Sequence, residues 1–273
     1  MRPRKSLGQH FLTHPALLAR IAAATGAGPG DVVLEIGPGK GGLTAALLDR
    51  GATVVAIERD EALHARLNDA FGRRDFALIA GDALEADWAA LVAPWTTQGK
   101  RWLVVGNIPY YITSPLLAKA LSAPLPAGVI FLVQREVADR IVAPAGAEDY
   151  GALSVGIQAV ARARKLLPVG KAAFTPPPKV DSALIELVPR ADPLVAPERI
   201  GEFRRLVTSL FSYRRKRMVR ALRQAADLSA SEAETVLTEA VIDFEGRPET
   251  VSPEGFVRLL EAMTARVAPA PRS

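Results

Sequence analysis

Five short apolar runs, each followed by a more polar segment, set the strongest limit on how this chain folds. They are rich in β-branched residues and nearly free of charge, and they lie at residues 32–36, 53–57, 76–80, 102–105 and 129–133. Runs of this kind are typical of strands buried on both faces of a parallel sheet. Ala- and Leu-rich segments at residues 43–50, 61–71 and 115–122 supply crossover helices. The pattern predicts a doubly wound α/β domain.

Two further runs, at residues 165–169 and 183–188, bring the predicted strands to seven. A proline-rich linker follows at residues 189–197, and the pattern beyond it is helical only. Helical spacing begins at Phe203, and further helices are predicted to begin near Ser229 and Ser252. We therefore expect a Rossmann-like, seven-stranded catalytic domain over residues 1–190 and a small all-helical domain over residues 191–273.

Composition excludes several classes of protein. Among 273 residues there is no cysteine, which rules out disulfides, thiolate nucleophiles, cysteine-ligated zinc and iron–sulfur clusters. The longest uncharged apolar stretch is too short to span a membrane, and the basic N-terminus lacks the apolar region of a signal peptide. We expect a soluble, cytoplasmic protein. Its net charge of +5 and pI near 9.7 suggest a polyanionic partner.

A glycine-rich loop, residues 35–42, joins the first strand to a helix, the context in which such loops bind nucleotides. Gly37 and Gly39 permit tight turning and close approach of the backbone to a ligand. Lys40 lacks the flanking residues of a P-loop, which removes the main support for triphosphate chemistry. The alternative is a strand-to-helix turn that binds nothing.

Acidic residues end the next two strands. Glu58 ends the second strand, where a carboxylate accepts the hydroxyls of a ribose in both NAD and S-adenosylmethionine enzymes. Asp82 follows the third strand and could accept a hydrogen bond from an adenine amino group. Taken alone, Glu58 is also consistent with a solvated carboxylate at a strand end, but its spacing of 21 positions from Gly37 favours the ribose role.

The tetrapeptide Asn107-Ile108-Pro109-Tyr110 at the end of the fourth strand has a specific chemical use. Adenine N6 is a poor nucleophile because its lone pair is delocalised into the ring. If the Asn107 oxygen and the carbonyl of Ile108 or Pro109 accept both N–H groups, the lone pair points outward and can attack a methyl group. Pro109 fixes the turn, and Tyr110 can stack on the base. The alternative is an ordinary β-turn.

These motifs resemble the KsgA/RsmA family of small-subunit rRNA adenine-N6 dimethyltransferases over almost the whole chain. The resemblance also rests on residues 8–12, 133–137, 150–155 and 174–182. It implies that the S-adenosylmethionine site is lined by His10, Leu12, Gly37, Gly39, Glu58, Asp82 and Asn107. It also implies that Tyr110 and Phe174 stack on the target adenine. The family often has asparagine where this chain has His10.

The resemblance further implies transfer of two methyl groups to N6 of each of two adjacent adenines near the 3′ end of 16S rRNA, within an assembling 30S subunit. Three alternatives remain. They are a resistance methyltransferase acting on large-subunit rRNA, a non-catalytic RNA-binding factor with the same fold, and a nicotinamide-dependent oxidoreductase. The last gives no reason for Asp82 or for the Asn-Pro-Tyr motif.

Between Arg204 and Arg223 there are eight basic residues and no acid. We expect a cationic helix that binds the RNA backbone through Arg214, Arg215, Lys216, Arg217, Arg220 and Arg223. The alternative is a solvated face, or pairing with the acids that follow. A second anchor is predicted at Arg2, Arg4 and Lys5. His14 and His64 lack ligand spacing, so we predict no metal, and we expect a monomer.

Overall fold

The computed structural model describes residues 10–96 and 99–267, and the chain divides into two compact units. The first spans Met1–Ala138 and Ala163–Pro189, and the second spans Asp139–Arg162 and Arg190–Ser273. The predicted domains differ from these units in residues 139–162, which group with the helical unit because α7 (Ala152–Gln158) packs against α8 (Ile200–Phe211). The predicted anchor at Arg2, Arg4 and Lys5 lies outside the described residues.

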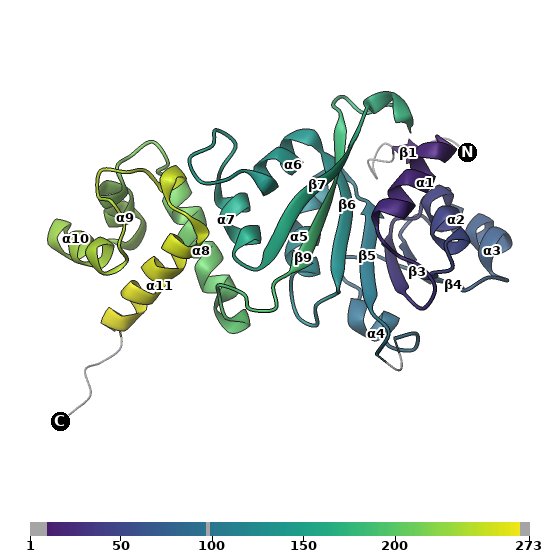
Figure 1. Ribbon diagram of the computed structural model, residues 1–273, viewed down its shortest axis with the longest axis horizontal. Coiled ribbons are helices and arrows are strands. Elements are labelled where there is room, and N and C mark those ends of the chain that lie inside the picture. Colours follow the sequence, from purple (N-terminus) through teal and green to yellow (C-terminus); the bar gives the residue numbers. More distant parts are fainter. Residues whose placement is uncertain (1–9, 97–98, 268–273) are drawn as a thin grey trace. The chain divides into compact units, whose positions relative to one another are not determined.

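The first unit is built on a sheet whose strands follow the order β4-β3-β2-β5-β6-β9-β7 (Figure 1). The strands are β2 (Val32–Ile36), β3 (Thr53–Glu58), β4 (Phe76–Ala80), β5 (Trp102–Asn107), β6 (Gly128–Gln134), β7 (Ala161–Val169) and β9 (Ser182–Pro189). All seven predicted strands are confirmed. β2 to β6 run parallel, and β9 runs antiparallel to β6. A parallel arrangement brings the carboxyl ends of β2 to β5 to one edge of the sheet.

Helices precede, connect and follow the parallel strands, and the connecting helices complete βαβ units. They are α1 (Pro15–Ala24), α2 (Gly42–Asp49), α3 (His64–Phe71), α4 (Trp88–Val92), α5 (Thr113–Ala120) and α6 (Arg135–Val142). Single turns of 3₁₀ helix occur at η2 (Glu61–Leu63), η4 (Tyr110–Ile112) and η5 (Lys171–Ala173). α1 and α2 pack together beside the sheet (Figure 1), and their buried leucines and isoleucine join the core of the unit.

A two-stranded sheet that the sequence pattern does not predict joins β1 (Phe11–Leu12) to β8 (Phe174–Thr175). The strands are antiparallel and place Leu12 opposite Phe174. Strands of two residues are too short to show the alternation by which strands are recognised. This sheet ties the start of the described chain to the segment before β9.

The second unit is helical apart from the first residues of β7. Besides α7 and α8 it contains α9 (Met218–Ala226), α10 (Ala230–Glu239) and α11 (Pro253–Val267), with single turns at η6 (Pro197–Arg199) and η7 (Pro248–Thr250). The predicted helix starts are confirmed, because Ser229 caps α10 in a capping box with Glu232, and α11 begins at Pro253.

The prediction of one cationic helix between Arg204 and Arg223 is wrong. α8 ends at Phe211, the chain turns through residues 212–217, and α9 begins at Met218. The four consecutive cations at residues 214–217 therefore lie in the turn. The turn lets these like charges spread into solvent, while Leu210 before it and Met218 after it are both buried.

Candidate active site

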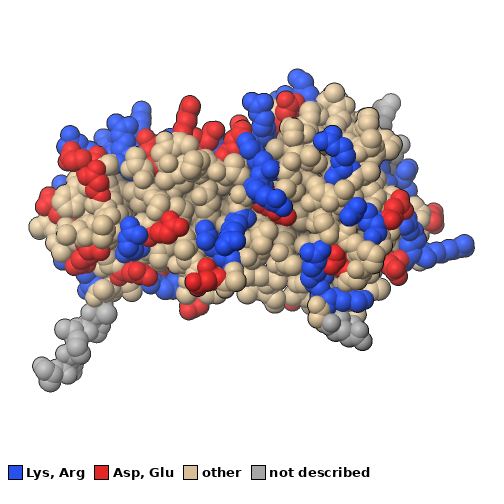
Figure 2. All heavy atoms as spheres, in the orientation of Figure 1, with Lys and Arg blue, Asp and Glu red and all other residues tan. Residues whose placement is uncertain are grey.

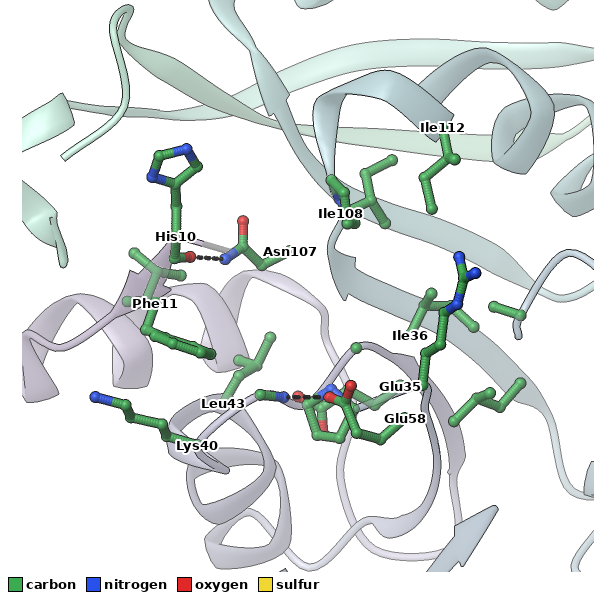
Figure 3. A pocket seen from close by; sticks show the side chains of 18 of the residues that line it. His10, Phe11, Glu35, Ile36, Lys40, Leu43, Glu58, Asn107, Ile108 and Ile112 are labelled. Atoms are coloured by element: carbon green, nitrogen blue, oxygen red, sulfur yellow. Dashed lines mark hydrogen bonds between the residues drawn. The ribbon is translucent and has the colours of Figure 1, made fainter. Parts of the chain in front are cut away.

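A pocket opens where β2, β3 and β5 end, at the carboxyl edge of the parallel strands (Figure 3). Almost all of the predicted cofactor and catalytic residues line it: His10, Leu12, Gly37, Gly39, Glu58, Asp82, Asn107, Pro109 and Tyr110. They come from segments far apart in the sequence, which the topology brings together at the strand ends. Phe174 is the exception, since it does not line this pocket.

The glycine-rich loop forms one wall of the pocket. Gly37 and Gly39 have φ values of 68° and 58°, in the left-handed region that side chains with a Cβ rarely adopt. A Cβ on Gly39 would also lie 3.0 Å from the ring of Phe11. The loop therefore requires glycine for both conformation and space. Lys40 places its Nζ 4.9 Å from the centre of the Phe11 ring, a cation–π distance.

Two backbone N–H groups hold the Glu58 carboxyl in place. Its Oε2 accepts the Gly39 N–H at 3.1 Å, and its Oε1 accepts the Asp60 N–H at 2.8 Å (Figure 3 shows the first bond). The side chain is only 6% exposed, and this burial raises the pKa of the carboxyl. A carboxylate offers about four lone-pair sites, so Glu58 keeps the capacity to accept two hydroxyl groups of a ligand.

Glu35 also lines the pocket, although no sequence motif assigns it a role. It is 1% exposed and accepts a hydrogen bond of 2.7 Å from the Thr44 hydroxyl. Desolvation on burial, with a smaller contribution from nearby Glu58, raises the pKa of Glu35 to about 7. A lone acid within an otherwise apolar strand was the available signal, because buried carboxyls are rare without a function or a partner.

Asp82 faces the pocket from the loop after β4. Its Oδ1 accepts the Leu84 N–H at 2.9 Å, and its Oδ2 lies 3.2 Å from the Arg59 guanidinium. The Arg59 side chain is largely exposed, and solvent weakens ion pairs of this kind. Asp82 can therefore accept a further hydrogen bond from a ligand amino group.

The Asn107 amide has a defined orientation. Its Nδ2 donates a hydrogen bond of 2.8 Å to the backbone carbonyl of His10, as Figure 3 shows. The Oδ1 is thus the atom left to accept hydrogen bonds in the pocket. The Pro109 carbonyl already accepts the Ile112 N–H at 3.1 Å. Of the two backbone carbonyls predicted to accept a hydrogen bond beside Asn107 Oδ1, that of Ile108 is therefore the better placed.

Tyr110 is fixed on two sides. Its hydroxyl forms a 3.0 Å hydrogen bond with Ser182, and its ring stacks on the imidazole of His10 with centroids 5.9 Å apart and planes 23° apart. His10 Nδ1 lies 2.8 Å from the Pro176 carbonyl. A carbonyl only accepts, so Nδ1 carries the proton in this bond. Burial raises the pKa of Tyr110, so its hydroxyl stays protonated.

The structure does not support the role predicted for Phe174. The ring is only 3% exposed and belongs to the hydrophobic core that includes Phe11 and Leu18. Pairing of β8 with β1 turns the side chain inward, so the proline-rich loop does not present it for stacking on a base.

The predicted RNA-binding cations meet in the second unit. A hollow is lined by Arg215, Lys216, Arg217, Arg220, Arg223 and Arg247, together with Glu245. Arg214 instead pairs with Glu249, and Arg217 pairs with Glu245. Figure 2 shows acidic side chains among the basic ones on the visible face of this unit. The predicted alternative, pairing with later acids, thus holds for part of the basic segment.

Over residues 10–96 and 99–267, no group of three or more acidic or histidine side chains is placed to hold a metal ion. In the same ranges no helix has the length and apolarity needed to cross a membrane.

Comparison with known proteins decides the family. A family model described as ribosomal RNA adenine dimethylase matches residues 1–262. The chain belongs to this family. The ribosomal RNA small subunit methyltransferase A of Phenylobacterium zucineum is 43% identical over 265 residues, covering 96% of this chain and 89% of the relative. The protein of the same name from Moorella thermoacetica is 41% identical, covering 94% and 91%.

Two solved structures share the fold of this chain. A dimethyladenosine transferase from Plasmodium falciparum shares the fold with a TM-score of 0.81 at 24% identity, covering 94% of this chain and 98% of that chain. The 23S rRNA methyltransferase ErmE has a TM-score of 0.70 at 28% identity, covering 93% and 99%. The predicted family, the Rossmann-like fold and the enzyme class, an rRNA adenine dimethyltransferase, are confirmed.

Proposed function

We propose that the protein transfers methyl groups from S-adenosylmethionine to N6 of two adjacent adenines near the 3′ end of 16S rRNA, giving N6,N6-dimethyladenosine in the assembling 30S subunit. The observation that carries this proposal is the Asn107 amide, whose Nδ2 is bound to His10 so that Oδ1 is free to accept. The names of the relatives support the small subunit as the substrate.

The pocket fits S-adenosylmethionine by the chemistry of its donors and acceptors. Glu58 would accept the ribose hydroxyls, and Asp82 would accept the adenine amino group. Gly37 and Gly39 leave room for the ligand, and His10, Leu12 and Asn107 complete the wall. When bound, S-adenosylmethionine would supply an electrophilic methyl group and, once the bond from sulfur to that methyl breaks, would leave as S-adenosylhomocysteine.

Asn107 and Ile108 prepare the nucleophile. The Asn107 Oδ1 and the Ile108 carbonyl accept the two N–H bonds of adenine N6, which directs its lone pair outward. Tyr110 lies against the base, and Pro109 sets the turn that presents these groups. N6 becomes acidic only as the new bond forms, so its proton leaves to water and no dedicated base is required. A mono-methylated N6 keeps one N–H and a lone pair, so the same site acts twice.

The helical unit grips the RNA backbone. Arg215, Lys216, Arg220 and Arg223 gather in one hollow and would neutralise phosphates, which positions the substrate without reading its sequence. Target choice then comes from RNA shape and the surrounding ribosomal particle. The protein acts as a monomer in the cytoplasm, where the assembling subunit is found.

Mass-spectrometric mapping tests the proposal. Small subunits purified from a strain lacking this protein would be incubated with it and labelled S-adenosylmethionine. We expect two adjacent N6-dimethyladenines near the 3′ end of 16S rRNA. Label on large-subunit rRNA would instead favour the activity of a resistance methyltransferase, and cofactor binding without label on any rRNA would favour a binding factor.

A further inference from the structure

The tyrosine directly after the Asn-Pro-Tyr motif, Tyr111, is exposed at the pocket. Tyr111 lines the same pocket as Asn107 and Tyr110, yet its side chain is 58% exposed. It lies in the 3₁₀ turn η4, between Tyr110 and Ile112, directly after the turn that presents the target base in the proposed function. Exposing an aromatic ring forgoes the stabilisation that its burial would give, so the fold gains little from a tyrosine at this position.

Tyr110 is the ring proposed to lie against the target adenine, and the phenylalanine rings at or near the pocket are buried. Tyr110 has His10 stacked against its ring and Ser182 bonded to its hydroxyl. Phe11 is buried against the glycine-rich loop with Lys40 over its ring. Phe174 is in the core. Among the described residues that line this pocket, Tyr111 is the aromatic side chain with most of its surface open.

We propose that Tyr111 stacks on the nucleotide beside the adenine held at Asn107, so that the pocket mouth recognises a pair of bases. This inference rests on the proposed function, which requires two adjacent adenines to enter the site in turn. An unstacked base in single-stranded RNA loses the contacts of its neighbours, and an aromatic side chain replaces them irrespective of sequence. Tyr111 lies one residue from Tyr110, so two consecutive bases would meet two consecutive tyrosines.

The stacking role predicts that loss of the Tyr111 ring weakens the binding of small subunits but not the binding of the cofactor. Tyr111→Ala removes the platform and should raise KM for small subunits by about 10- to 100-fold, the range for losing one base-stacking contact. It should also shift the ratio of methyl groups between the two adenines. Tyr111→Phe keeps the ring and should behave like wild type. Trp95→Ala removes an aromatic side chain that is 37% exposed and does not line the pocket, and serves as the matched control.

The experiment measures steady-state transfer to small subunits, the methyl count at each adenine by mass spectrometry, and affinity for S-adenosylhomocysteine by calorimetry. We expect Tyr111→Ala to bind S-adenosylhomocysteine as wild type does. An unchanged KM and methyl pattern would overturn the inference. So would weaker S-adenosylhomocysteine binding with normal RNA dependence, because Tyr111 would then be part of the cofactor wall. The proposed function fails separately, if wild-type protein itself does not label both adenines.

Discussion

The active-site pocket and the basic hollow hold their charges in different ways. In the pocket, the Glu35 and Glu58 carboxyls are buried; Glu35 accepts one hydrogen bond and Glu58 accepts two, all of 3.1 Å or less. In the hollow, Arg217 is an exposed cation whose partner Glu245 is equally exposed. Removing one partner from a buried polar network costs far more than removing one from an exposed pair. Substitutions of buried polar groups in the pocket should therefore change turnover or stability strongly. Substitutions in the hollow should change RNA affinity by smaller amounts.

The largest effect is expected at Asn107. Asn107→Ala removes the acceptor proposed for N6 and the donor that binds the His10 carbonyl. By analogy with the loss of one preorganised hydrogen-bonding group at a reacting centre, turnover should fall by about 10²- to 10³-fold or more. Single-turnover transfer of labelled methyl groups to small subunits measures this. Binding of S-adenosylhomocysteine and the melting temperature serve as controls, and both should change far less than turnover, because the variant loses one wall contact and one hydrogen bond to His10. Normal turnover by this variant would contradict the role of the amide.

A second large effect should appear in the pH dependence of stability. Burial raises the pKa of Glu35 to about 7 from 4.5, so between these values the folded state binds a proton that the unfolded state has released. Stability therefore falls as pH rises from about 4.5 to 7, and the loss is complete above the folded pKa. Each pKa unit corresponds to about 1.4 kcal/mol, which gives a total of a few kcal/mol.

Glu35→Gln isolates this contribution. Glutamine has nearly the same shape, keeps an acceptor for the Thr44 hydroxyl, and does not ionise. In urea unfolding without cofactor, wild type and variant should be similar near pH 5. The variant should become the more stable protein as pH rises to 8. A constant difference between the two across this range would show that Glu35 titrates normally in the folded state.

Phe174 lies in the hydrophobic core and does not line the pocket. Because its ring is in the core, Phe174→Leu should lower the free energy of unfolding by about 1–2 kcal/mol through lost packing. Turnover and KM for small subunits should remain near wild type at a temperature where the variant is folded. Chemical denaturation and steady-state kinetics together test this. A normal unfolding free energy with a large loss of turnover would restore Phe174 as a stacking residue.

The two regions also differ in how far the sequence could predict them. Parallel strands with apolar sequences place their carboxyl ends at one edge, so motif residues such as Glu58, Asp82 and Asn107 could be assigned to one site from their positions at strand ends. Phe174 follows no such rule, since its burial depends on a pairing of two-residue strands that leaves no periodic signal. Glu35 was visible as an acid in an apolar run, but its degree of burial is set by tertiary packing.

The basic segment shows the complementary limit. Eight cations without an acid identify a cationic surface, but sequence spacing does not show which acids fold back onto it. Glu245 and Glu249 lie in the turn region before α11 and reach Arg217 and Arg214 through the fold of the second unit. Charge counts along the chain therefore overestimate the number of cations that are free to meet RNA.

The smallest effects should separate the paired cations from the unpaired ones. Arg223 has no carboxylate partner among residues 10–96 and 99–267, whereas Arg217 has Glu245. If Arg223 meets a phosphate, Arg223→Gln should reduce the slope of log affinity against log salt by about 0.7–0.9. Arg217→Gln should change the slope less, because Glu245 already balances that charge. Fluorescence anisotropy of a labelled rRNA hairpin over a series of salt concentrations measures both.

Glu245→Gln completes this comparison by freeing Arg217 without adding a cation. An exposed ion pair contributes about 0.2–1 kcal/mol, so RNA affinity should rise only a few-fold, and more at low salt than at high salt. The variant should also make the slope steeper, because Arg217 then contributes a full phosphate contact. If Arg217→Gln and Arg223→Gln change the slope equally in the wild-type background, Glu245 exchanges freely with phosphate. The ion pairs would then not reduce the number of cations in the hollow that contact RNA phosphates.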